Sequence, residues 1–565
     1  PPPPPPPPRP QLVFAPPEII YDPQLKKVVQ SIDQFSTAFR SPGQSYTNVI
    51  PILDRFYKAH GGNNFDMNRV DLVNAAGTEL GPNRRVAGAL FEIDMILTVA
   101  QANRLAANRR RRMLVARSAP LWPTTITYKF NENDVEWRAR ILQVLNAYET
   151  NTCLRFRESS NPTGDYVLFA RGEGCMSSLG RLGGGQLLSV GYGCEQMGII
   201  AHELSHTLGF WHEHSRPDRD SYVKVNAQNM QEGAGSQFVK RSTAEGDTQG
   251  LPFDYGSIMH YAANAYSKSS TLYTLEPRDV LYRSTIGSRS EPSFLDYKHV
   301  NKRYCSRTCS PIGCQNGGYT DPNNCSQCKC PLGLGGRLCD RVQESVCGME
   351  LMANGQWRNI SFSGSSNCYW RVRAPAANLR VEFELTHVWF TCAPACNEYV
   401  ELKWHTDLSL AGGRLCCHPE GGVRVTDADT LLVSAKTSKS AQFTLRYRIQ
   451  GGEPAKRPRM IESSPLPQTL SGAGTWTAWS EWSACGERCG ACGRHTRTRA
   501  CYDPPCGGEA EEVRPCNVQA CPQGLTLSGE RWTRAVDYEA HTRHKRSWCC
   551  EGFTNNADGI CQKRY

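Results

Sequence analysis

The chain has 565 residues, which is too long for one hydrophobic core and indicates several domains. Its formal net charge of +10 comes without a nucleic-acid-binding motif, so we expect acidic matrix or substrate partners rather than nucleic acid. The sequence has no apolar run of about 18 residues, so it predicts no membrane-spanning helix. None of the 26 cysteines precedes Cys153 and most follow Cys305, a density typical of secreted, extracellular modules with disulfide bonds.

The stretch 1–112 contains no cysteine and ends in a basic run. Its proline tract favours a stiff polyproline II arm that acts as a spacer. Two later segments, PQLKKVVQSIDQFSTAFR and FEIDMILTVAQANRLAANR, have the apolar spacing of helices. In a secreted chain, the four arginines that end at Arg112 predict a pro-segment that a convertase removes by cleavage after Arg112. The alternative for this run is a solvated basic turn, or a nucleic-acid or heparin patch.

Residues 113–305 form the next predicted domain. TITYKF, DYVLFA and LLSV are typical of strands, and NDVEWRARILQVLNAYETN has apolar residues spaced for a helix, so the class is α+β. Further along, the segment HELSHTLGFWHEH begins at His202. If this segment is helical, His202 and His206 lie on one face, one turn apart. Gly209 can take the left-handed conformation that ends a helix, so the chain can turn back at His212.

These residues predict a catalytic zinc centre with one Zn²⁺ per chain. Three neutral imidazoles, from His202, His206 and His212, leave one position of a tetrahedral zinc ion open to water, which is typical of a catalytic site. Zinc lowers the pKa of that water to about 7, and Glu203 is placed to accept its proton. His214 lies beyond the last ligand, so we expect it to be exposed or hydrogen-bonded rather than metal-bound. The predicted reaction is hydrolysis.

The histidine pattern is joined by SIMHY at Ser257–Tyr261, and this pairing is the metzincin motif. The form HELSHTLGFWHEHSRPDRD together with SIMHY resembles the astacin family of zinc endopeptidases. The resemblance implies that Tyr261 is a fifth metal ligand that swings away to bind the developing oxyanion. It also implies that Met259, in the methionine turn, forms a hydrophobic floor beneath the zinc and that Glu213 tethers the new N-terminus of the mature chain. The alternative for Glu213 is a plain surface carboxylate.

The resemblance extends to two disulfide bonds and a loop. It implies the pairs Cys153–Cys305 and Cys175–Cys194, of which the second closes the glycine-rich segment CMSSLGRLGGGQLLSVGYGC. This loop shapes substrate subsites in the family, so Arg181 is a candidate for contacts with acidic substrate side chains. In the tolloid-like branch a second arginine follows, whereas this chain has Leu182, so we do not expect a strict aspartate preference.

The segment FEIDM at Phe91–Met95 is similar to the FxGD motif with which astacin pro-segments silence the enzyme. The resemblance implies that Asp94 occupies the open zinc position as a zymogen switch, and a carboxylate oxygen is a suitable zinc ligand. Ile93 replaces the usual glycine, and a β-branched residue enters the left-handed region only at a cost, so we expect a different approach to the metal. The alternative is that Asp94 caps the following helix. Cleavage after the arginine run would leave Met113 nine residues before Trp122, the spacing in mature astacins.

The rest of the sequence resembles a series of binding modules. Residues 306–340, with CQNGG and CPLGLGGRLC, resemble an EGF-like domain, and 347–450 have the alternating strands of a β-sandwich CUB domain. After a linker at 451–473, the sequence of 474–522 resembles a thrombospondin type 1 repeat, and a cysteine-containing tail occupies 523–565. The repeat is expected to stack arginines on indole rings, from Trp476, Trp479, Trp482, Arg497 and Arg499.

The cysteines of these modules are expected to pair within each module. The resemblance implies the bonds Cys309–Cys325, Cys314–Cys328, Cys330–Cys339, Cys347–Cys368 and Cys392–Cys416. Cys396 and Cys417 are expected to form an extra pair. The sequence does not decide whether Cys492 bonds a cysteine of its own repeat or one of the C-terminal tail. Asn324 and Asn359 lie in N-x-S sequons and are candidate glycosylation sites.

The predicted fold class is multidomain: an α+β metzincin protease domain followed by disulfide-rich EGF-like, β-sandwich CUB and thrombospondin type 1 modules. This order resembles the nematode astacins of that architecture, most closely the cuticle-collagen-processing type. From the resemblance we expect a secreted zinc metalloendopeptidase that processes cuticle procollagen, with matrix or glycosaminoglycan contacts through the CUB and thrombospondin modules. Two alternatives stay open, an adhesive matrix protein with a vestigial protease domain and an astacin of broad extracellular specificity, because fold-level likeness cannot name a substrate.

Overall fold

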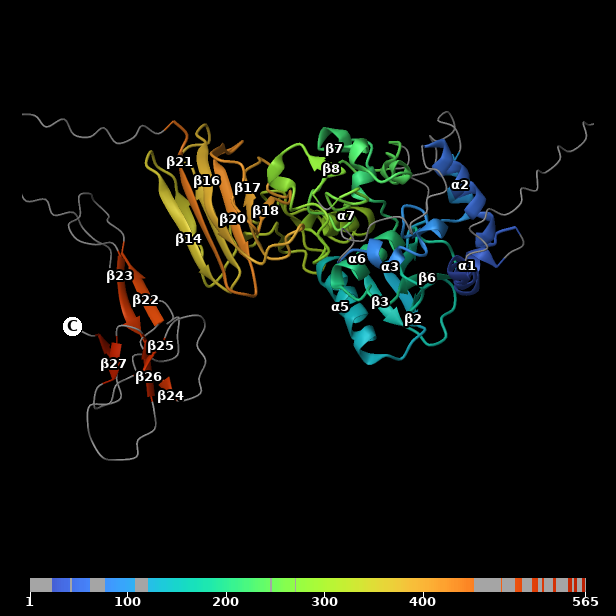
Figure 1. Cartoon of the computed structure of the whole chain (residues 1–565), viewed down its shortest axis with the longest axis horizontal. Helices are drawn as coiled ribbons and strands as arrows, with labels where there is room; N and C mark the ends of the chain where they lie inside the picture. Colours follow the sequence, from blue (N-terminus) through green and yellow to red (C-terminus); the bar gives the residue numbers. More distant parts are fainter. Residues whose placement is uncertain are drawn as a thin grey trace, which may run out of the picture. The chain divides into compact units, whose positions relative to one another are not determined.

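The structure, a computed structural model, forms two compact units, residues 1–457 and 458–565, which are described separately (Figure 1). The residues that the structure describes are 23–40, 43–60, 77–106, 120–243, 246–269, 271–451, 479, 493–499, 511–516, 521–522, 532–534, 547–550, 553–555 and 561–563. The proline tract, the predicted cleavage site at Arg112 and Cys492 lie outside these residues. No helix within the described ranges is long and apolar enough to cross a membrane.

The predicted pro-segment folds as a helical layer on the protease domain. Its main helices are α1 (Pro23–Phe35), α2 (Ile50–Ala59) and α4 (Val99–Ala106). The buried face of α1 has helical spacing and consists of Leu25, Val28 and Ile32. This face shares a hydrophobic core with Met176 and Leu187 of the protease domain. The pro-segment is therefore docked by apolar burial as well as by contacts at the histidines.

The second predicted helix of the pro-segment begins later than the apolar spacing suggested. The prediction included Phe91, but α4 starts only at Val99. Before it, Phe91 and Met95 exchange two backbone hydrogen bonds of 2.9 and 3.0 Å and form a tight turn. Thr98 caps α4 because its Oγ1 accepts from the backbone N of Gln101 at 3.1 Å. The alternative in which Asp94 caps this helix is therefore wrong.

A six-stranded sheet in the order β1-β5-β6-β4-β2-β3 lies beside the histidine helix. Its protease strands are β2 (Thr125–Phe130), β3 (Arg155–Glu158), β4 (Tyr166–Ala170), β5 (Cys175–Ser178) and β6 (Gly185–Val190). The edge strand β1 (Met95–Ile96) comes from the pro-segment and pairs in parallel with β5, with Met95 opposite Ser177. The pro-segment thus extends the sheet directly after the turn that carries Asp94.

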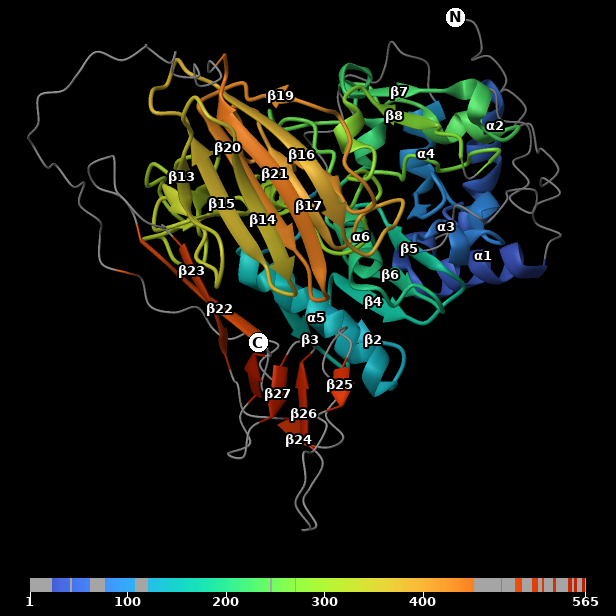
Figure 2. The same ribbon diagram turned by 60° about the vertical axis from the view of Figure 1, so that its left-hand side comes forward.

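Three helices complete the protease domain and confirm the α+β class (Figure 2). They are α5 (Val135–Asn151), α6 (Met197–Thr207) and α7 (Phe294–Tyr304). Helix α5 begins where predicted, because Asp134 accepts from the backbone N of Trp137 at 3.0 Å. Helix α6 is buried along its length from Gly198 to Thr207, since α5 covers it on one side and β5 on another. A short antiparallel pair, β7 (Val223–Val225) and β8 (Leu275–Pro277), lies further along the chain.

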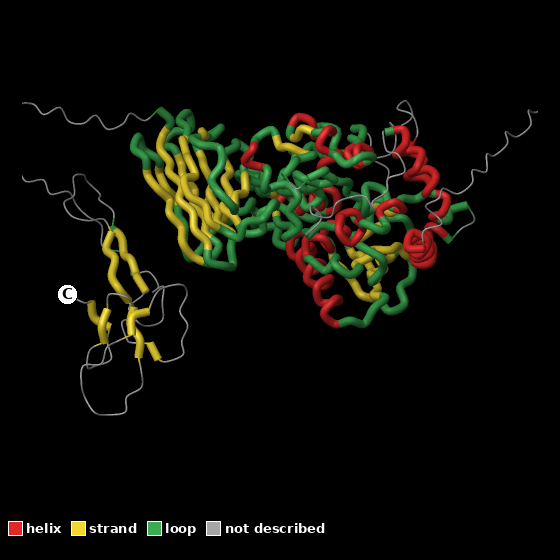
Figure 3. Tube along the Cα trace, in the orientation of Figure 1, coloured by secondary structure: helices red, strands yellow, loops and turns green. Residues whose placement is uncertain are grey.

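The described segments after Cys305 contain strands, drawn in yellow in Figure 3, and are joined by disulfide bonds. The predicted EGF-like region contains the short strands β9 (Tyr319–Thr320), β10 (Cys328–Lys329), β11 (Leu334–Gly335) and β12 (Arg341–Val342). The next region is a sandwich of two sheets, in the orders β13-β15-β20-β17-β18 and β14-β21-β16-β19. Its strands are β13 (Glu350–Met352), β14 (Arg358–Gly364), β15 (Cys368–Arg373), β16 (Val381–Trp389), β17 (Tyr399–Lys403), β18 (Gly413–Leu415), β19 (Arg424–Val425), β20 (Thr430–Lys436) and β21 (Ala441–Ile449).

Two predicted disulfide bonds of the sandwich are wrong. The structure pairs Cys392 with Cys417 and Cys396 with Cys416, whereas the expected bond joined Cys392 to Cys416 and left Cys396 with Cys417. Cys396 and Cys416 are both buried, while Cys392 is exposed and Cys417 is half-buried. Cys416 and Cys417 lie in a bend directly after β18, and their sulfur atoms are 3.9 Å apart, so local spacing does not decide which partner each one bonds. The other bonds between described residues of the first unit are those expected, Cys153–Cys305, Cys175–Cys194, Cys309–Cys325, Cys314–Cys328, Cys330–Cys339 and Cys347–Cys368.

Within the first unit the sandwich packs directly on the protease domain. Tyr282 of the protease domain lies in the same apolar core as the sandwich residues, with its ring 5.4 Å from that of Trp404. Arg424 forms two hydrogen bonds to Asp279, at 2.6 and 2.8 Å. The backbone N of Arg414 donates to Thr285 Oγ1 at 2.9 Å. The protease domain and the sandwich therefore share one buried interface.

The second unit contains short antiparallel strands. They are β22 (Gly493–Thr498), β23 (Glu511–Cys516), β24 (Cys521–Pro522), β25 (Trp532–Arg534), β26 (Ser547–Cys550), β27 (Phe553–Asn555) and β28 (Cys561–Lys563). The guanidinium groups of Arg497 and Arg499 lie 4.8 and 4.4 Å from the centre of the Trp479 ring. These contacts are the cation–π stacking that the sequence predicted for this tryptophan; Trp476 and Trp482 lie outside the described residues.

Candidate active site

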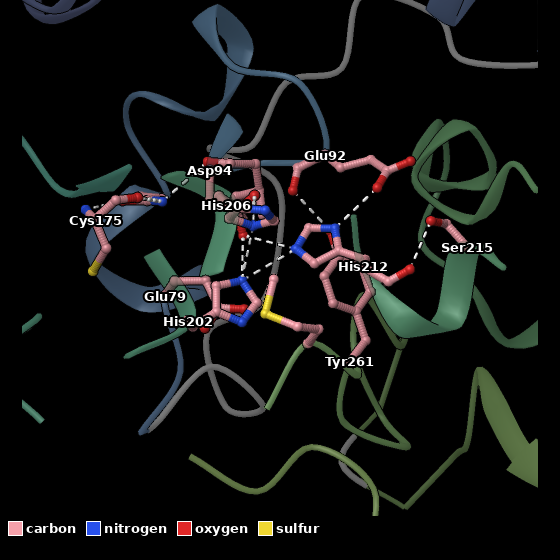
Figure 4. Close-up of polar contacts among 12 residues, drawn as sticks. Glu79, Glu92, Asp94, Cys175, His202, His206, His212, Ser215 and Tyr261 are labelled. Carbon is pink, nitrogen blue, oxygen red and sulfur yellow. Dashed lines mark hydrogen bonds and ion pairs between the residues drawn. The ribbon is translucent and has the colours of Figure 1, made fainter. Parts of the chain in front are cut away.

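Helix α6 brings two of the predicted ligands together. The Nε2 atoms of His202 and His206 are 3.1 Å apart, and both rings are buried. Figure 4 shows the two side chains directed to one point, as their spacing on a helix predicted. Burial lowers the pKa of His202 to about 4, which keeps its imidazole neutral and able to coordinate a metal.

The third histidine reaches the same point because α6 ends abruptly. Gly209 has φ +92°, a left-handed conformation that a residue with a side chain adopts only with strain. A side chain at Gly209 would also lie 3.1 Å from the guanidinium of Arg303. After this turn, the Nε2 of His212 lies 3.2 Å from that of His202. The predicted helix stop is thus the feature that assembles the three imidazoles.

The hydrogen bonds of the three Nδ1 atoms show which ring nitrogen of each histidine is available to bind a cation. The Nδ1 atoms of His202 and His206 lie 2.7 and 2.8 Å from the backbone carbonyls of Ile258 and Phe210, which can only accept hydrogen bonds. The Nδ1 of His212 lies 2.9 Å from Glu92 Oε2. With each Nδ1 donating its proton, three Nε2 lone pairs face one another. Donors about 2.0–2.1 Å from a tetrahedral zinc are about 3.3 Å apart, so the spacing of these atoms fits that ion.

Asp94 of the pro-segment supplies a fourth donor. Its Oδ2 lies 3.3 Å from His202 Nε2 and 3.1 Å from His212 Nε2, and its Oδ1 lies 3.4 Å from His206 Nε2. Burial opposes its ionisation, but His212 and His206 outweigh that effect and hold the pKa of Asp94 well below its usual range. The buried carboxylate is therefore charged and forms, with the three imidazoles, a group that could hold a metal ion.

Ile93 takes the backbone conformation that we expected it to avoid. Its φ is +79°, and that of Glu92 is +44°, so the turn before Asp94 lies in the left-handed region despite the β-branched side chain. Such a residue costs about 1–3 kcal/mol. The side chain of Ile93 is buried in an apolar cluster with Leu80 and Tyr261, and its carbonyl accepts from Asn83 Nδ2 at 3.0 Å. These contacts offset the strain, so the β-branched side chain does not keep Ile93 out of the left-handed region.

Glu203 lies on α6 next to the first histidine and is fully buried. Within the described part of the chain, neither oxygen of its carboxylate has a hydrogen-bond partner. Burial, reinforced by the charges of Asp94 and Glu79, raises the pKa of Glu203 well above its usual range. A buried carboxylate without a partner is costly, so its presence beside the imidazoles is unexplained unless it has a role there. It is positioned to take up a proton.

The methionine turn, Ser257–Tyr261, is held beneath the imidazoles by α7. Asp296 Oδ1 accepts from Ser257 Oγ at 2.6 Å, and Asp296 Oδ2 accepts from the backbone N of Ile258 at 3.0 Å. Met259 is buried in the same apolar core as α6. Sequence reasoning missed Asp296, although the capping box that it forms with Ser293 could have indicated its place at the start of a helix.

Two other predicted residues have partners that the sequence did not suggest. His214 is buried, with its ring stacked 3.8 Å from that of Tyr261 and its Nε2 3.2 Å from the Gln237 carbonyl, so it is hydrogen-bonded rather than exposed. Arg181 is ion-paired with Asp165 and donates to the Leu121 carbonyl at 2.9 Å.

Glu213 borders a cavity of about 360 Å³ that also reaches Pro120, the first described residue of the protease domain. Its Oε1 accepts from Arg216 Nη1 at 3.0 Å and from the backbone N of Asp254 at 2.8 Å. The carboxylate is buried, so the alternative of a plain surface position is wrong. The pro-segment also contributes a buried ion pair beside the site, in which Glu79 accepts from Arg289 at 2.7 and 2.9 Å.

The geometry and the fold define a zinc peptidase of the metzincin type. The family model described as Astacin, a peptidase family, matches residues 115–305, and the thrombospondin type 1 domain model matches 477–521. The chain belongs to the astacin family of zinc metallopeptidases.

Several nematode proteins are similar along most of the chain. Zinc metalloproteinase nas-30 of Caenorhabditis elegans is 39% identical over 75% of this chain, which spans 60% of that relative's length. Zinc metalloproteinase nas-37 of the same species is 33% identical over 86% of this chain and 79% of its own length. Zinc metalloproteinase dpy-31, also of this species, is 35% identical over 84% of each chain. The solved structure of high choriolytic enzyme 1, a hatching enzyme zinc-protease of Oryzias latipes, is 34% identical over 34% of this chain and 94% of that chain, with a TM-score of 0.31.

Proposed function

We propose that this chain is a secreted zinc metalloendopeptidase that hydrolyses peptide bonds of extracellular matrix proteins, with cuticle procollagen as its substrate. The main observation in favour of peptidase activity is the convergence of three Nε2 atoms beside the carboxylate of Glu203, which has no hydrogen-bond partner among the described residues. The similarity to nematode astacins supports the substrate class. Disulfide-bonded modules after Cys305 support secretion, because such bonds persist outside the cytosol.

In this proposal His202, His206 and His212 hold the zinc ion. A zinc ion in that position acts as a Lewis acid that lowers the pKa of a water molecule. Glu203, whose carboxylate has no other partner among the described residues, accepts the proton of the attacking water and delivers it to the leaving amine. Tyr261 donates a hydrogen bond from its hydroxyl to the developing oxyanion once it is free to turn. Met259 supports the imidazoles from below.

The proposed latent form depends on the pro-segment. Asp94 fills the position that water and substrate need, and cleavage after Arg112 removes it. The new N-terminus then enters the cavity beside Glu213, whose Oε1 already has two partners, so that Oε2 is the oxygen proposed to bind the amine. Two observations support this placement of the new N-terminus. Pro120 lines the cavity, and only a few residues of sequence separate Pro120 from the proposed new N-terminus at Met113.

The other modules are proposed to bind the matrix rather than to react. The CUB and thrombospondin modules contact matrix proteins or glycosaminoglycan, which agrees with the net charge of +10. Asn324 and Asn359 are exposed and are proposed to carry glycans. Arg181 is proposed to help bind acidic substrate side chains, although its pairing with Asp165 leaves only part of its charge for that role.

A cleavage-site profile of the processed enzyme on cuticle procollagen and on unrelated matrix proteins tests the proposal. We expect chelator-sensitive cleavage at one site of procollagen and slow cleavage of the others. Comparable cleavage of all of them would favour a broad extracellular peptidase. Zinc binding without any peptidase activity, in a chain processed at Arg112, would favour the adhesive protein with a vestigial protease domain.

A further inference from the structure

Glu92 connects the pro-segment to the third histidine through the outer ring nitrogen. Its Oε2 accepts from His212 Nδ1 at 2.9 Å, and its Oε1 lies 3.1 Å from Arg241 Nη2. Both carboxylate oxygens are buried with the residue, which is 0% exposed. Figure 4 shows the carboxylate of Glu92 on the side of His212 that faces away from His202. Glu92 is therefore not one of the donors that face the metal position.

The other two histidines have a different kind of support. Their Nδ1 atoms donate to the backbone carbonyls of Ile258 and Phe210, which belong to the protease domain and remain after cleavage at Arg112. His212 alone among the three takes its outer partner from the pro-segment, and that partner is a carboxylate. A carboxylate in this position fixes the tautomer and the ring and makes the imidazole a better metal ligand.

The protease domain and the pro-segment together enclose this carboxylate, with Arg241 as the cation opposite it. Arg241 is 3% exposed, and its guanidinium lies 5.1 Å from the ring of Phe91, 5.6 Å from that of Trp211 and 5.7 Å from that of Phe56. The backbone of Glu92 is also held on both sides, since its N lies 3.1 Å from the Tyr57 hydroxyl and its carbonyl accepts from Tyr261. Its φ of +44° shows that these contacts outweigh local backbone strain.

We propose that Glu92 is a positioning residue that completes the outer shell of the metal centre in the uncleaved chain, so that the pro-segment retains zinc as well as covering it. Release of the pro-segment then deprives His212 of its carboxylate and weakens zinc binding in the mature enzyme. This inference rests on the proposed role of His212 as a zinc ligand. The pro-segment would then help to retain zinc in a second way. Asp94 faces the metal position itself, whereas Glu92 acts through the ring of His212.

The test uses the full-length chain with Arg112→Ala, so that the pro-segment stays covalently attached, and measures zinc affinity by competition with a chelator. Glu92→Gln keeps the shape of the side chain but removes its charge, and we expect zinc to bind about 10- to 100-fold more weakly. Asp33→Asn is the matched control, because Asp33 is a pro-segment carboxylate that accepts hydrogen bonds from the backbone N of Tyr46 at 2.6 Å and from Ser45 Oγ at 2.7 Å rather than from a histidine. We expect this control to leave zinc affinity unchanged.

A second measurement separates positioning from general loosening of the pro-segment. In the cobalt-substituted chain, the Nδ1 protons of coordinated histidines give separate shifted resonances. Glu92→Gln should shift the resonance of His212 and speed its exchange with solvent, while those of His202 and His206 stay in place. If the variant folds poorly, the double change Glu92→Leu and Arg241→Leu removes both charges together and should show the same weaker zinc binding.

Two results distinguish failure of this inference from failure of the proposed zinc site. If Glu92→Gln binds zinc as tightly as the parent while His212→Ala loses it, the outer-shell role of Glu92 is overturned and the zinc site stands. If His212→Ala keeps zinc, the ligand assignment itself is wrong. Equal losses in Glu92→Gln and Asp33→Asn, with all three histidine resonances changed, would also overturn the proposal.

Discussion

The hydroxyl of Tyr261 donates a hydrogen bond of 2.9 Å to the backbone carbonyl of Glu92. The tyrosine of the methionine turn is thus held by the pro-segment, whose aspartate two residues later lies among the histidines. One turn of the pro-segment therefore engages both the metal position and the proposed oxyanion donor. In the proposed mechanism, removal of that turn releases the Tyr261 hydroxyl from this hydrogen bond.

Tyr261→Phe in the processed enzyme should lower kcat by about 10²- to 10³-fold with little change in KM. The hydroxyl is proposed to act on charge that develops in the transition state, and one oxyanion donor contributes about that much. Steady-state kinetics on a peptide substrate would measure the effect. A raised KM at unchanged kcat would instead show that the hydroxyl binds the ground state.

Glu203→Ala should abolish turnover while the protein keeps its fold and its zinc. Its carboxylate lies outside the converging Nε2 and Asp94 atoms, and general base catalysis accounts for about 10²- to 10⁴-fold in rate. Activity and zinc content should be measured on the same preparation. Loss of zinc together with activity would assign Glu203 to the metal shell, and retention of most activity would remove it as the base.

Asp94→Ala in a chain that also carries Arg112→Ala should give an uncleaved protein with measurable peptidase activity. The substitution opens the position that the carboxylate occupies, whereas the apolar core shared by α1 and the protease domain keeps the pro-segment docked. The parent with Arg112→Ala alone should stay uncleaved and silent. A silent Asp94→Ala protein that still binds zinc would show that the rest of the pro-segment is sufficient for latency.

Glu401→Ala should destabilise the protease domain and the sandwich together. Glu401 is 1% exposed, and its Oε2 accepts from Arg414 Nε at 2.8 Å while its Oε1 lies 3.6 Å from Lys403 Nζ. Removing it leaves two buried cations, a change that costs about 3–5 kcal/mol. Thermal unfolding of the uncleaved chain, followed at both domains, should show one earlier transition.

The matched control for that change is Glu384→Ala on another strand of the sandwich. Glu384 accepts from Arg446 Nε at 2.6 Å, but this pair is partly exposed, with side-chain exposures of 40% for Arg446 and 23% for Glu384. Such a pair contributes about 0–1 kcal/mol, so we expect little change in unfolding. Similar losses in both variants would mean that burial at the interface does not set the stability of the unit.

Local spacing in the sequence is sufficient to predict which three histidines converge. His202 and His206 share a face because a helix repeats every 3.6 residues, and Gly209 ends that helix at a fixed distance from His212. The identity of the fourth donor, Asp94, came from resemblance to a known motif. The resemblance also predicted the modules after Cys305 and all but two of the observed disulfide bonds of the first unit.

The contacts that span the chain could be decided only by the tertiary structure. Whether Ile93 could enter the left-handed region depended on the core that buries it, and the sequence alone predicted the opposite. The pairing of Cys416 and Cys417, adjacent residues in a bend, depended on where the segment that carries Cys392 and Cys396 docks. The contact between Glu92 and His212 joins residues 120 positions apart. Local patterns follow from backbone geometry that a short segment contains in full, whereas these contacts depend on how separate segments dock, and that is determined by burial summed over the whole domain.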